Sequence, residues 1–304
     1  MTMTMNDIKT VGVLGGGLMG SGIAQVCAAR GYSTIVREIT DELGAKARAA
    51  IVRSFDKAIE KGKATAADRD AALARIAFTT LLKDLATADI VIEAVVEDLV
   101  VKSQMFTELD SLCGPNTIFA SNTSSLTIAE IAAATARPDR FVGMHFFNPV
   151  PAMKLVEVVR AIKTSEATVE RALAFVHSLG KEPIRAHDNS GFVVNLLLVP
   201  YMIDAIRALE SGVASVSDID KGMMLGAGYP MGPFTLLDFV GLDTTYKIAE
   251  IMYDEYREQR YAPPPLLKRM VIAGMYGKKS GMGFYDYSTN PPVPNDLGVG
   301  RSKQ

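Results

Sequence analysis

The chain has 304 residues, with 32 basic and 34 acidic side chains and a formal net charge of −2. This near-neutral balance gives no electrostatic reason to expect a nucleic acid as partner. The length is sufficient for two domains with separate cores, and the 48% of hydrophobic residues are typical of an ordinary globular protein.

We expect neither a targeting segment at the start of this sequence nor a membrane-spanning segment within it. The start, MTMTMNDIKT, lacks the basic and apolar regions of a signal peptide. The longest apolar run, residues 192–203, contains Asn195 and Pro200 and is too short to cross a bilayer. We therefore expect no membrane partner and a cytoplasmic location. The segment 290–304 is rich in Pro, Gly and Asn and is expected to be mobile.

The first half of the chain alternates short apolar runs with helical patterns. Strands are expected at 10–15, 33–38, 88–95, 117–122 and 141–147, with helices between them. Further strands at 154–160 and 182–187, on either side of a helix at 165–179, extend the same sheet. Such strands separated by helices are typical of a parallel sheet that helices cover on both faces. The pattern predicts an α/β fold, with a Rossmann-type domain over residues 1–187.

Two parts of the chain depart from this alternation. The helical segment 41–75 is far longer than the dozen or so residues that a crossover between strands requires, and we expect a helical hairpin arm. From 192 to about 275 the pattern is helical, with interruptions at Gly212, 226–233 and Gly241. We therefore predict an all-α C-terminal domain over residues 188–304.

A glycine-rich turn follows the first predicted strand and opens the first helix. Gly15, Gly17 and Gly20 occupy the glycine positions of G-x-G-x-x-G, and Leu18 and Met19 lie between the last two. In this context the motif predicts a dinucleotide site, because the helix N-terminus offers free N–H groups and a positive dipole to a pyrophosphate. Alone, the glycines are a weak match, and the alternative is a glycine-rich structural turn with a solvated glutamate.

Glu38 ends the second predicted strand, in the position of the acidic residue that binds the ribose hydroxyls of NAD. Its charge would also repel a 2′-phosphate, so NAD is favoured over NADP. Arg37 stands beside it and weakens that preference, because an arginine can accommodate the 2′-phosphate.

His145 is one of three histidines and lies in the apolar run GMHFFNPVP, with Glu157 twelve positions later on the next predicted strand. A histidine in an apolar strand is more often structural than catalytic. A neutral imidazole that is oriented by a carboxylate is nevertheless suited to take a proton near neutral pH. Local sequence alone leaves both interpretations open.

The chain resembles the short-chain L-3-hydroxyacyl-CoA dehydrogenase family, and within it the 3-hydroxybutyryl-CoA dehydrogenase subgroup. The resemblance extends over residues 8–288. Six blocks carry it: GGGLMGSGIAQ (15–25), SNTSSL (121–126), GMHFFNPVPAMKLVEV (143–158), NSGFVVN (189–195), GAGYPMGPFTLLDFVGLDT (226–244) and KKSGMGFYDY (278–287).

The resemblance implies an NAD-dependent enzyme that interconverts 3-hydroxyacyl-CoA and 3-ketoacyl-CoA, such as 3-hydroxybutyryl-CoA and acetoacetyl-CoA. It implies a helical C-terminal domain that forms a homodimer, and no metal. His145 would be the catalytic base, Glu157 its partner, and Ser124 and Asn195 would lie near the reacting oxygen. The cofactor residues implied in addition to the glycine turn and Glu38 are Glu97, Lys102, Asn122, Ser124, Asn148 and Lys279. Ser54, Lys61 and Ser124 would contact coenzyme A.

Several of these implied roles have alternatives. Ser121 and Ser125 are close to Ser124 in the sequence and could be mistaken for it, and Asn195 could be a helix-capping or interdomain residue. Lys61 belongs to a basic helix face that could simply be solvated. For the whole chain, the alternatives are a dehydrogenase of a non-CoA 3-hydroxy acid, of carnitine or gulonate type, and an NAD-binding protein without activity.

Overall fold

The computed structural model describes residues 7–299, which form two compact units. The first unit ends at Phe192 and the second begins at Val193. The sequence pattern places this division slightly earlier, after His187. Among the described residues, no helix is long and apolar enough to cross a membrane.

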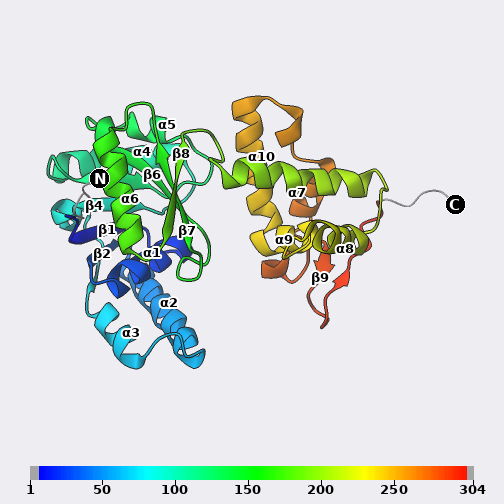
Figure 1. The fold of residues 1–304 in the computed structure, drawn as a ribbon, viewed down its shortest axis with the longest axis horizontal. Helices are drawn as coiled ribbons and strands as arrows, with labels where there is room; N and C mark the ends of the chain where they lie inside the picture. The colour runs from blue at the N-terminus through cyan, green and yellow to red at the C-terminus, as the bar shows by residue number, and fades with distance from the viewer. Residues whose placement is uncertain (1–6, 300–304) are drawn as a thin grey trace. The chain divides into compact units, whose positions relative to one another are not determined.

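The first unit is built on an eight-stranded sheet with the order β3-β2-β1-β4-β5-β6-β7-β8 (Figure 1). The first six strands of this order reproduce the 3-2-1-4-5-6 arrangement of dinucleotide-binding folds. The strands are β1 (Thr10–Leu14), β2 (Ser33–Arg37), β3 (Ile76–Thr79), β4 (Ile90–Glu93), β5 (Ile118–Ser121), β6 (Phe141–Phe146), β7 (Leu155–Arg160) and β8 (Glu182–His187).

Two features of this sheet differ from the expected one. Strand β3 was not predicted, because the four residues IAFT are too short to show a period. Strand β7 runs antiparallel to β6, and β8 runs parallel to β7, so the sheet is mixed. The turn 147–154 is short enough to reverse the chain directly, whereas a parallel connection needs a crossover.

Helices cover both faces of the sheet and define two cores. One core includes side chains of α1 (Leu18–Ala29), α2 (Asp41–Glu60) and α6 (Glu166–Ser178). The other includes side chains of α4 (Leu99–Leu112) and α5 (Ile128–Ala132). Side chains alternate between the faces along each strand. On β4, Ile90 and Ile92 belong to the first core and Val91 to the second.

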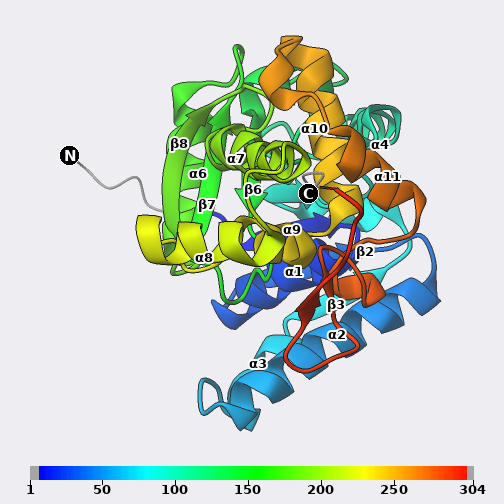
Figure 2. The same ribbon diagram turned by 90° about the vertical axis from the view of Figure 1, so that its right-hand side faces the viewer.

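The predicted arm is present as α2 and α3 (Ala66–Leu73), which pack against each other and extend away from the sheet (Figures 1 and 2). The Thr40 hydroxyl accepts a hydrogen bond from the Leu43 N–H and so begins α2. Thr65 and Asp68 form a capping box that begins α3. The local sequence therefore determines where both arm helices start.

The second unit has its own apolar core and consists mainly of helices. These are α7 (Val194–Glu210), α8 (Val216–Ala227), α9 (Pro233–Val240), α10 (Leu242–Tyr256) and α11 (Pro265–Ile272). It also contains a two-stranded antiparallel ribbon of β9 (Tyr285–Asp286) and β10 (Val293–Pro294), so the expectation of an exclusively helical domain was wrong in detail. Strand β10 lies in the segment 290–304 that was expected to be mobile, of which residues 300–304 are outside the described range.

Candidate active site

The glycine-rich turn connects β1 to α1 at the carboxyl edge of the sheet. Gly15 has φ +85°, a conformation that favours glycine. A Cβ on Gly20 would lie 1.7 Å from the Gly15 carbonyl oxygen, so only glycine lets the helix approach the strand so closely. A Cβ on Gly17 would meet nothing within 4 Å, so the backbone there is open to a ligand.

The N-terminus of α1 has the properties of an anion site. Gly17 is its N-cap residue, and within the described part of the chain this helix start has no side-chain cap hydrogen bond. Leu18 is 73% exposed and Met19 is partly buried, so neither side chain closes the turn. The turn therefore fits a dinucleotide pyrophosphate.

The Glu38 carboxylate is held beside this turn. Its Oε1 accepts a hydrogen bond of 2.5 Å from the Gly16 N–H, and its Oε2 accepts one of 3.2 Å from the Ile39 N–H. Arg37 instead donates from Nε to the Thr80 carbonyl at 3.3 Å. The carboxylate is thus fixed at the glycine turn, and the guanidinium is engaged at the end of the neighbouring strand β3.

His145 and Glu157 lie opposite each other on the antiparallel strands β6 and β7. Directly opposite residues of an antiparallel pair project from the same face of the sheet. Nδ1 of His145 lies 2.6 Å from Oε2 of Glu157, and both side chains are buried. The carboxylate can therefore hold the imidazole in the tautomer that leaves Nε2 without a proton.

The other imidazole nitrogen faces the serine loop, residues 122–126. Nε2 of His145 lies 3.3 Å from the Ser124 hydroxyl oxygen. The rings of Phe147 and Phe192 flank the imidazole, with centroids 4.5 and 5.7 Å from its own. A hydroxyl group bound near Ser124 would therefore lie close to Nε2 of His145. This base is oriented by the Glu157 carboxylate at its other nitrogen and is flanked by apolar rings.

Glu97 organises the serine loop. Its Oε1 accepts hydrogen bonds from the Thr123 hydroxyl at 2.5 Å and from the Ser124 N–H at 3.0 Å, and its Oε2 lies 3.1 Å from Nζ of Lys102. Burial acts to raise the pKa of the Glu97 carboxyl, but the Lys102 charge and the donors from Thr123 and Ser124 together hold that pKa below its ordinary value. Glu97 is therefore an ionised anchor for the loop.

This shift predicts how stability depends on pH. The pKa of Glu97 is lower in the folded than in the unfolded protein. At pH values between these two pKa values, the unfolded state therefore binds more protons than the folded state. Its contribution to the free energy of unfolding should be fully present above the ordinary pKa of 4.5 and lost as pH falls through the folded value. Urea unfolding between pH 3 and 6 should show a shallower acid slope for Glu97→Gln than for the wild type. Equal slopes would contradict the prediction.

The structure brings together most of the first-unit residues implied by the resemblance. Asn122 accepts a hydrogen bond of 2.8 Å from the Phe146 N–H, next to His145. Lys102 is buried, with its ammonium between carboxylates, and Asn148 is exposed on the turn 147–154. Ser54 and Lys61 lie apart on the arm, where Ser54 is partly buried in α2 and Lys61 is exposed at its C-cap.

Two predicted residues belong to the second unit. Asn195 is the second residue of α7 and is partly buried. Lys279 donates from Nζ to Oδ2 of Asp243 at 2.8 Å.

Sequence reasoning missed three residues that the structure places at or behind this site. They are Glu93, which is buried at the end of β4, and Phe147 and Phe192 beside the imidazole. A charged residue ending the apolar run ADIVIE was a signal for Glu93. Nothing in the local sequence marks Phe192, which contacts His145 only through the fold.

Comparison with known proteins decides the family. The profile of the 3-hydroxyacyl-CoA dehydrogenase NAD binding domain matches residues 10–189, and that of the C-terminal domain matches residues 191–287. The chain belongs to the 3-hydroxyacyl-CoA dehydrogenase family. The resemblance of the sequence motifs is confirmed, as is the prediction of an NAD-dependent dehydrogenase that acts on a CH–OH group.

Individual relatives cover almost the whole of this dehydrogenase. It is 52% identical over 286 residues to the 3-hydroxybutyryl-CoA dehydrogenase of Mycobacterium tuberculosis, covering 93% of this chain and 100% of the relative. It is 48% identical to the mitochondrial hydroxyacyl-coenzyme A dehydrogenase of Homo sapiens, covering 92% and 91%. The crystal structure of (S)-3-hydroxybutyryl-CoA dehydrogenase PaaH1 from Ralstonia eutropha superposes with a TM-score of 0.89 at 45% identity, covering 93% and 100%. The predicted Rossmann-type fold with a helical C-terminal domain is likewise confirmed.

Proposed function

We propose that this dehydrogenase interconverts acetoacetyl-CoA and (S)-3-hydroxybutyryl-CoA, with His145 as general base in oxidation and general acid in reduction. The observation that carries the proposal is the buried contact of 2.6 Å between Nδ1 of His145 and Oε2 of Glu157, with Nε2 turned to the Ser124 hydroxyl. The relatives include two 3-hydroxybutyryl-CoA dehydrogenases, which supports the choice of an acyl-CoA substrate.

Each residue has a defined task in this proposal. In oxidation, Nε2 of His145 takes the proton of the substrate 3-hydroxyl, and the Glu157 carboxylate stabilises the resulting imidazolium. The Ser124 hydroxyl holds the substrate oxygen, and Asn195 completes its hydrogen bonding. Bound NAD would supply the acceptor for the hydride that leaves C3 of the substrate in oxidation, and NADH would supply the hydride in reduction.

We propose NAD rather than NADP as the cofactor. Gly15, Gly17, Leu18, Met19 and Gly20 would hold the pyrophosphate, and Glu38 the ribose. The contact of Glu38 with the Gly16 N–H supports this preference, because a 2′-phosphate would meet a fixed negative charge. The further cofactor residues proposed are Glu97, Asn122, Ser124, Asn148 and Lys279. Lys102 is buried, and we assign it the support of Glu97 in place of direct contact.

Replacing Glu38 with alanine should weaken NADH binding, because the ribose hydroxyls lose their hydrogen-bond acceptor. It should also reduce the preference for NADH over NADPH, because the carboxylate no longer repels the 2′-phosphate of NADPH. The ratio of kcat/KM values with NADH and NADPH measures the effect, and we expect it to fall by about tenfold or more. Glu108→Ala, which removes an exposed carboxylate from α4, serves as control. An unchanged ratio of kcat/KM values in Glu38→Ala would show that this carboxylate does not discriminate between the two cofactors at the ribose.

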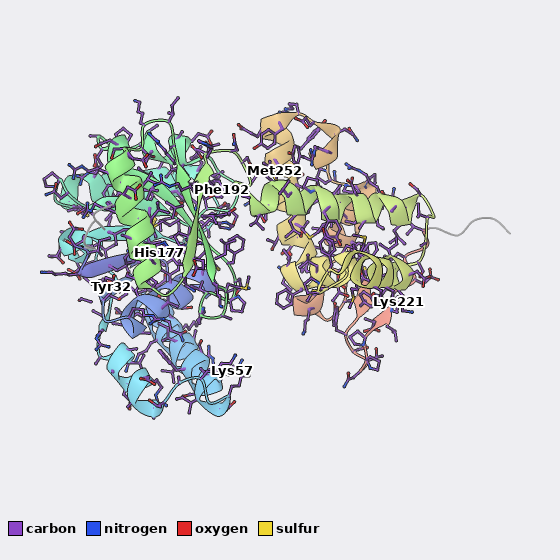
Figure 3. The ribbon with its side chains drawn as sticks, viewed as in Figure 1. Tyr32, Lys57, His177, Phe192, Lys221 and Met252 are labelled. Carbon is purple, nitrogen blue, oxygen red and sulfur yellow. The ribbon has the colours of Figure 1, made fainter. Side chains whose placement is uncertain are left out.

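The arm is the proposed site for coenzyme A. Arg53, Lys57 and Lys61 recur every four residues and are all exposed (Figure 3 labels Lys57). Residues four apart share a helix face. Such a face suits the 3′-phosphate and pyrophosphate of coenzyme A. Ser54, one residue after Arg53, would contribute its hydroxyl.

The oxidation of NADH with different substrates tests the proposed reaction. Absorbance should fall rapidly with acetoacetyl-CoA and remain nearly constant with acetoacetate or dehydrocarnitine. Turnover of the free acids alone would favour the non-CoA alternative. NADH binding without turnover of any of them would contradict the proposal.

We also propose a homodimer formed through the second unit. Large apolar side chains are exposed there, including Leu197 at 66%, Leu225 at 85% and Ile272 at 76%. Exposed apolar surface often marks a protein interface. Light scattering should therefore report twice the chain mass of 32.7 kDa. The cytoplasmic location stays a prediction from the sequence.

A further inference from the structure

Glu93 is a fully buried carboxylate for which the proposed reaction has no direct use. It is the last residue of β4, and its partner in register on β5 is Ser121. Both side chains project toward the face covered by α4, because they follow Val91 and Phe119 by two positions. Removing a carboxylate from water is costly unless charges and hydrogen bonds compensate for it. The Glu93 carboxylate therefore requires partners that compensate for its loss of hydration.

One oxygen of Glu93 reaches the serine loop through Lys102 and Glu97. Oε1 lies 2.6 Å from Nζ of Lys102, whose side chain is only 1% exposed. The same ammonium lies 3.1 Å from Oε2 of Glu97. Oε1 of Glu97 then accepts hydrogen bonds from the N–H groups of Ser124 and Ser125, at 3.0 and 3.3 Å. The ammonium thus links a buried carboxylate to the anchor of the loop.

The other oxygen of Glu93 reaches the same loop by a separate route. Oε2 accepts a hydrogen bond of 2.6 Å from the Ser121 hydroxyl. The oxygen of that hydroxyl in turn accepts one of 3.2 Å from the Thr123 N–H. The Glu93 backbone adds a third connection, because its carbonyl accepts from the Asn122 N–H at 2.8 Å. Both carboxylate oxygens and the backbone therefore lead to residues 122–125.

We propose that Glu93 is a positioning residue that fixes the serine loop from two sides, so that the Ser124 hydroxyl stays within reach of Nε2 of His145. This inference rests on the proposed roles of Ser124 and His145. Charge-assisted hydrogen bonds are short and directional, so they suit a loop whose hydroxyl must be placed within a fraction of an ångström. Lys102 is the charged link between the two glutamates.

Glu93→Gln tests the proposal, because it keeps the shape and removes the charge that orients Lys102. We expect kcat for acetoacetyl-CoA reduction, measured at saturating NADH, to fall by about 10- to 100-fold, as for a misplaced catalytic group. Asp89→Asn is the matched control. It alters a carboxylate at the opposite end of β4 that accepts hydrogen bonds from the Lys9 and Thr10 N–H groups, and it should leave kcat unchanged.

A double-mutant cycle with Ser124→Ala separates positioning from general stabilisation. If Glu93 acts through Ser124, Glu93→Gln should cost much less in the Ser124→Ala background than in the wild type. An equal loss of kcat in both backgrounds would overturn the inference while leaving the role of Ser124 intact. If Ser124→Ala alone left kcat unchanged, the proposed role of Ser124 would fail, and this inference with it.

A milder variant keeps the test decisive if Glu93→Gln does not fold, as judged by circular dichroism. Ser121→Ala removes only the link from Oε2 to the Thr123 N–H. In the same cycle, a loss of kcat that disappears in the Ser124→Ala background would support the proposal. A wild-type kcat for Ser121→Ala, or a loss that persists without the Ser124 hydroxyl, would overturn it.

Discussion

Replacing His145 with glutamine is expected to lower kcat by about 10²- to 10⁴-fold, the usual contribution of general acid–base catalysis. Glutamine can accept and donate hydrogen bonds, but it cannot take a proton from the substrate hydroxyl near neutral pH. NADH affinity should be nearly unchanged, because the glycine turn and Glu38 lie on other elements. Stopped-flow reduction of acetoacetyl-CoA, with a fluorescence titration of NADH, measures the two quantities separately.

His177→Gln is the matched control for this variant. His177 is exposed on α6 (Figure 3), so the same chemical change there should leave kcat at the wild-type value. If His145→Gln retained near-normal kcat, the base would be another group. If it lost NADH binding in parallel with kcat, a structural role of the histidine would be the better explanation.

Glu157→Gln should have the second largest effect, also about 10²- to 10⁴-fold in kcat. The amide can present its N–H to Nδ1 and stabilise the wrong tautomer, which leaves Nε2 protonated and unable to act as base. It also removes the negative charge that stabilises the imidazolium. Since the carboxylate is fully buried and 2.6 Å from Nδ1, solvent cannot replace it.

The combined variant of His145 and Glu157 shows whether the two act as one unit. Its kcat should be no lower than that of His145→Gln alone, because the carboxylate works only through the imidazole. Multiplicative losses would indicate an independent role of Glu157. Glu182→Gln, an exposed glutamate that begins β8, is the control and should retain full kcat.

The dinucleotide-binding half of the fold could be predicted because its signals are local. The turn from Gly15 to Gly20 requires backbone conformations and a close approach that only glycine allows, and the apolar runs have the length and composition of buried strands. The signals for the starts of the two arm helices are also local. Thr40 and Thr65 supply capping oxygens three residues before the N–H groups that donate to them.

The missed elements depended on pairing partners. Strand β3 is recognisable only as the neighbour of β2, and β9 and β10 are two residues each, too short for any period. The apolar pattern of β7 does not predict its direction, because the same pattern occurs beside parallel and antiparallel neighbours. It follows from the short turn 147–154, which returns the chain beside β6.

By itself, the sequence determined the family, the dinucleotide-binding turn and the identity of the candidate base. These depend on short blocks of residues whose chemistry can be recognised wherever the blocks lie. Only the tertiary structure decided that Glu157 lies opposite His145, and that the buried Glu93 and Lys102 form one network with the partly buried Glu97 behind Ser124. The reason is physical: buried charges are tolerated only where strand register and helix packing bring their partners to them, and register is a property of paired chains.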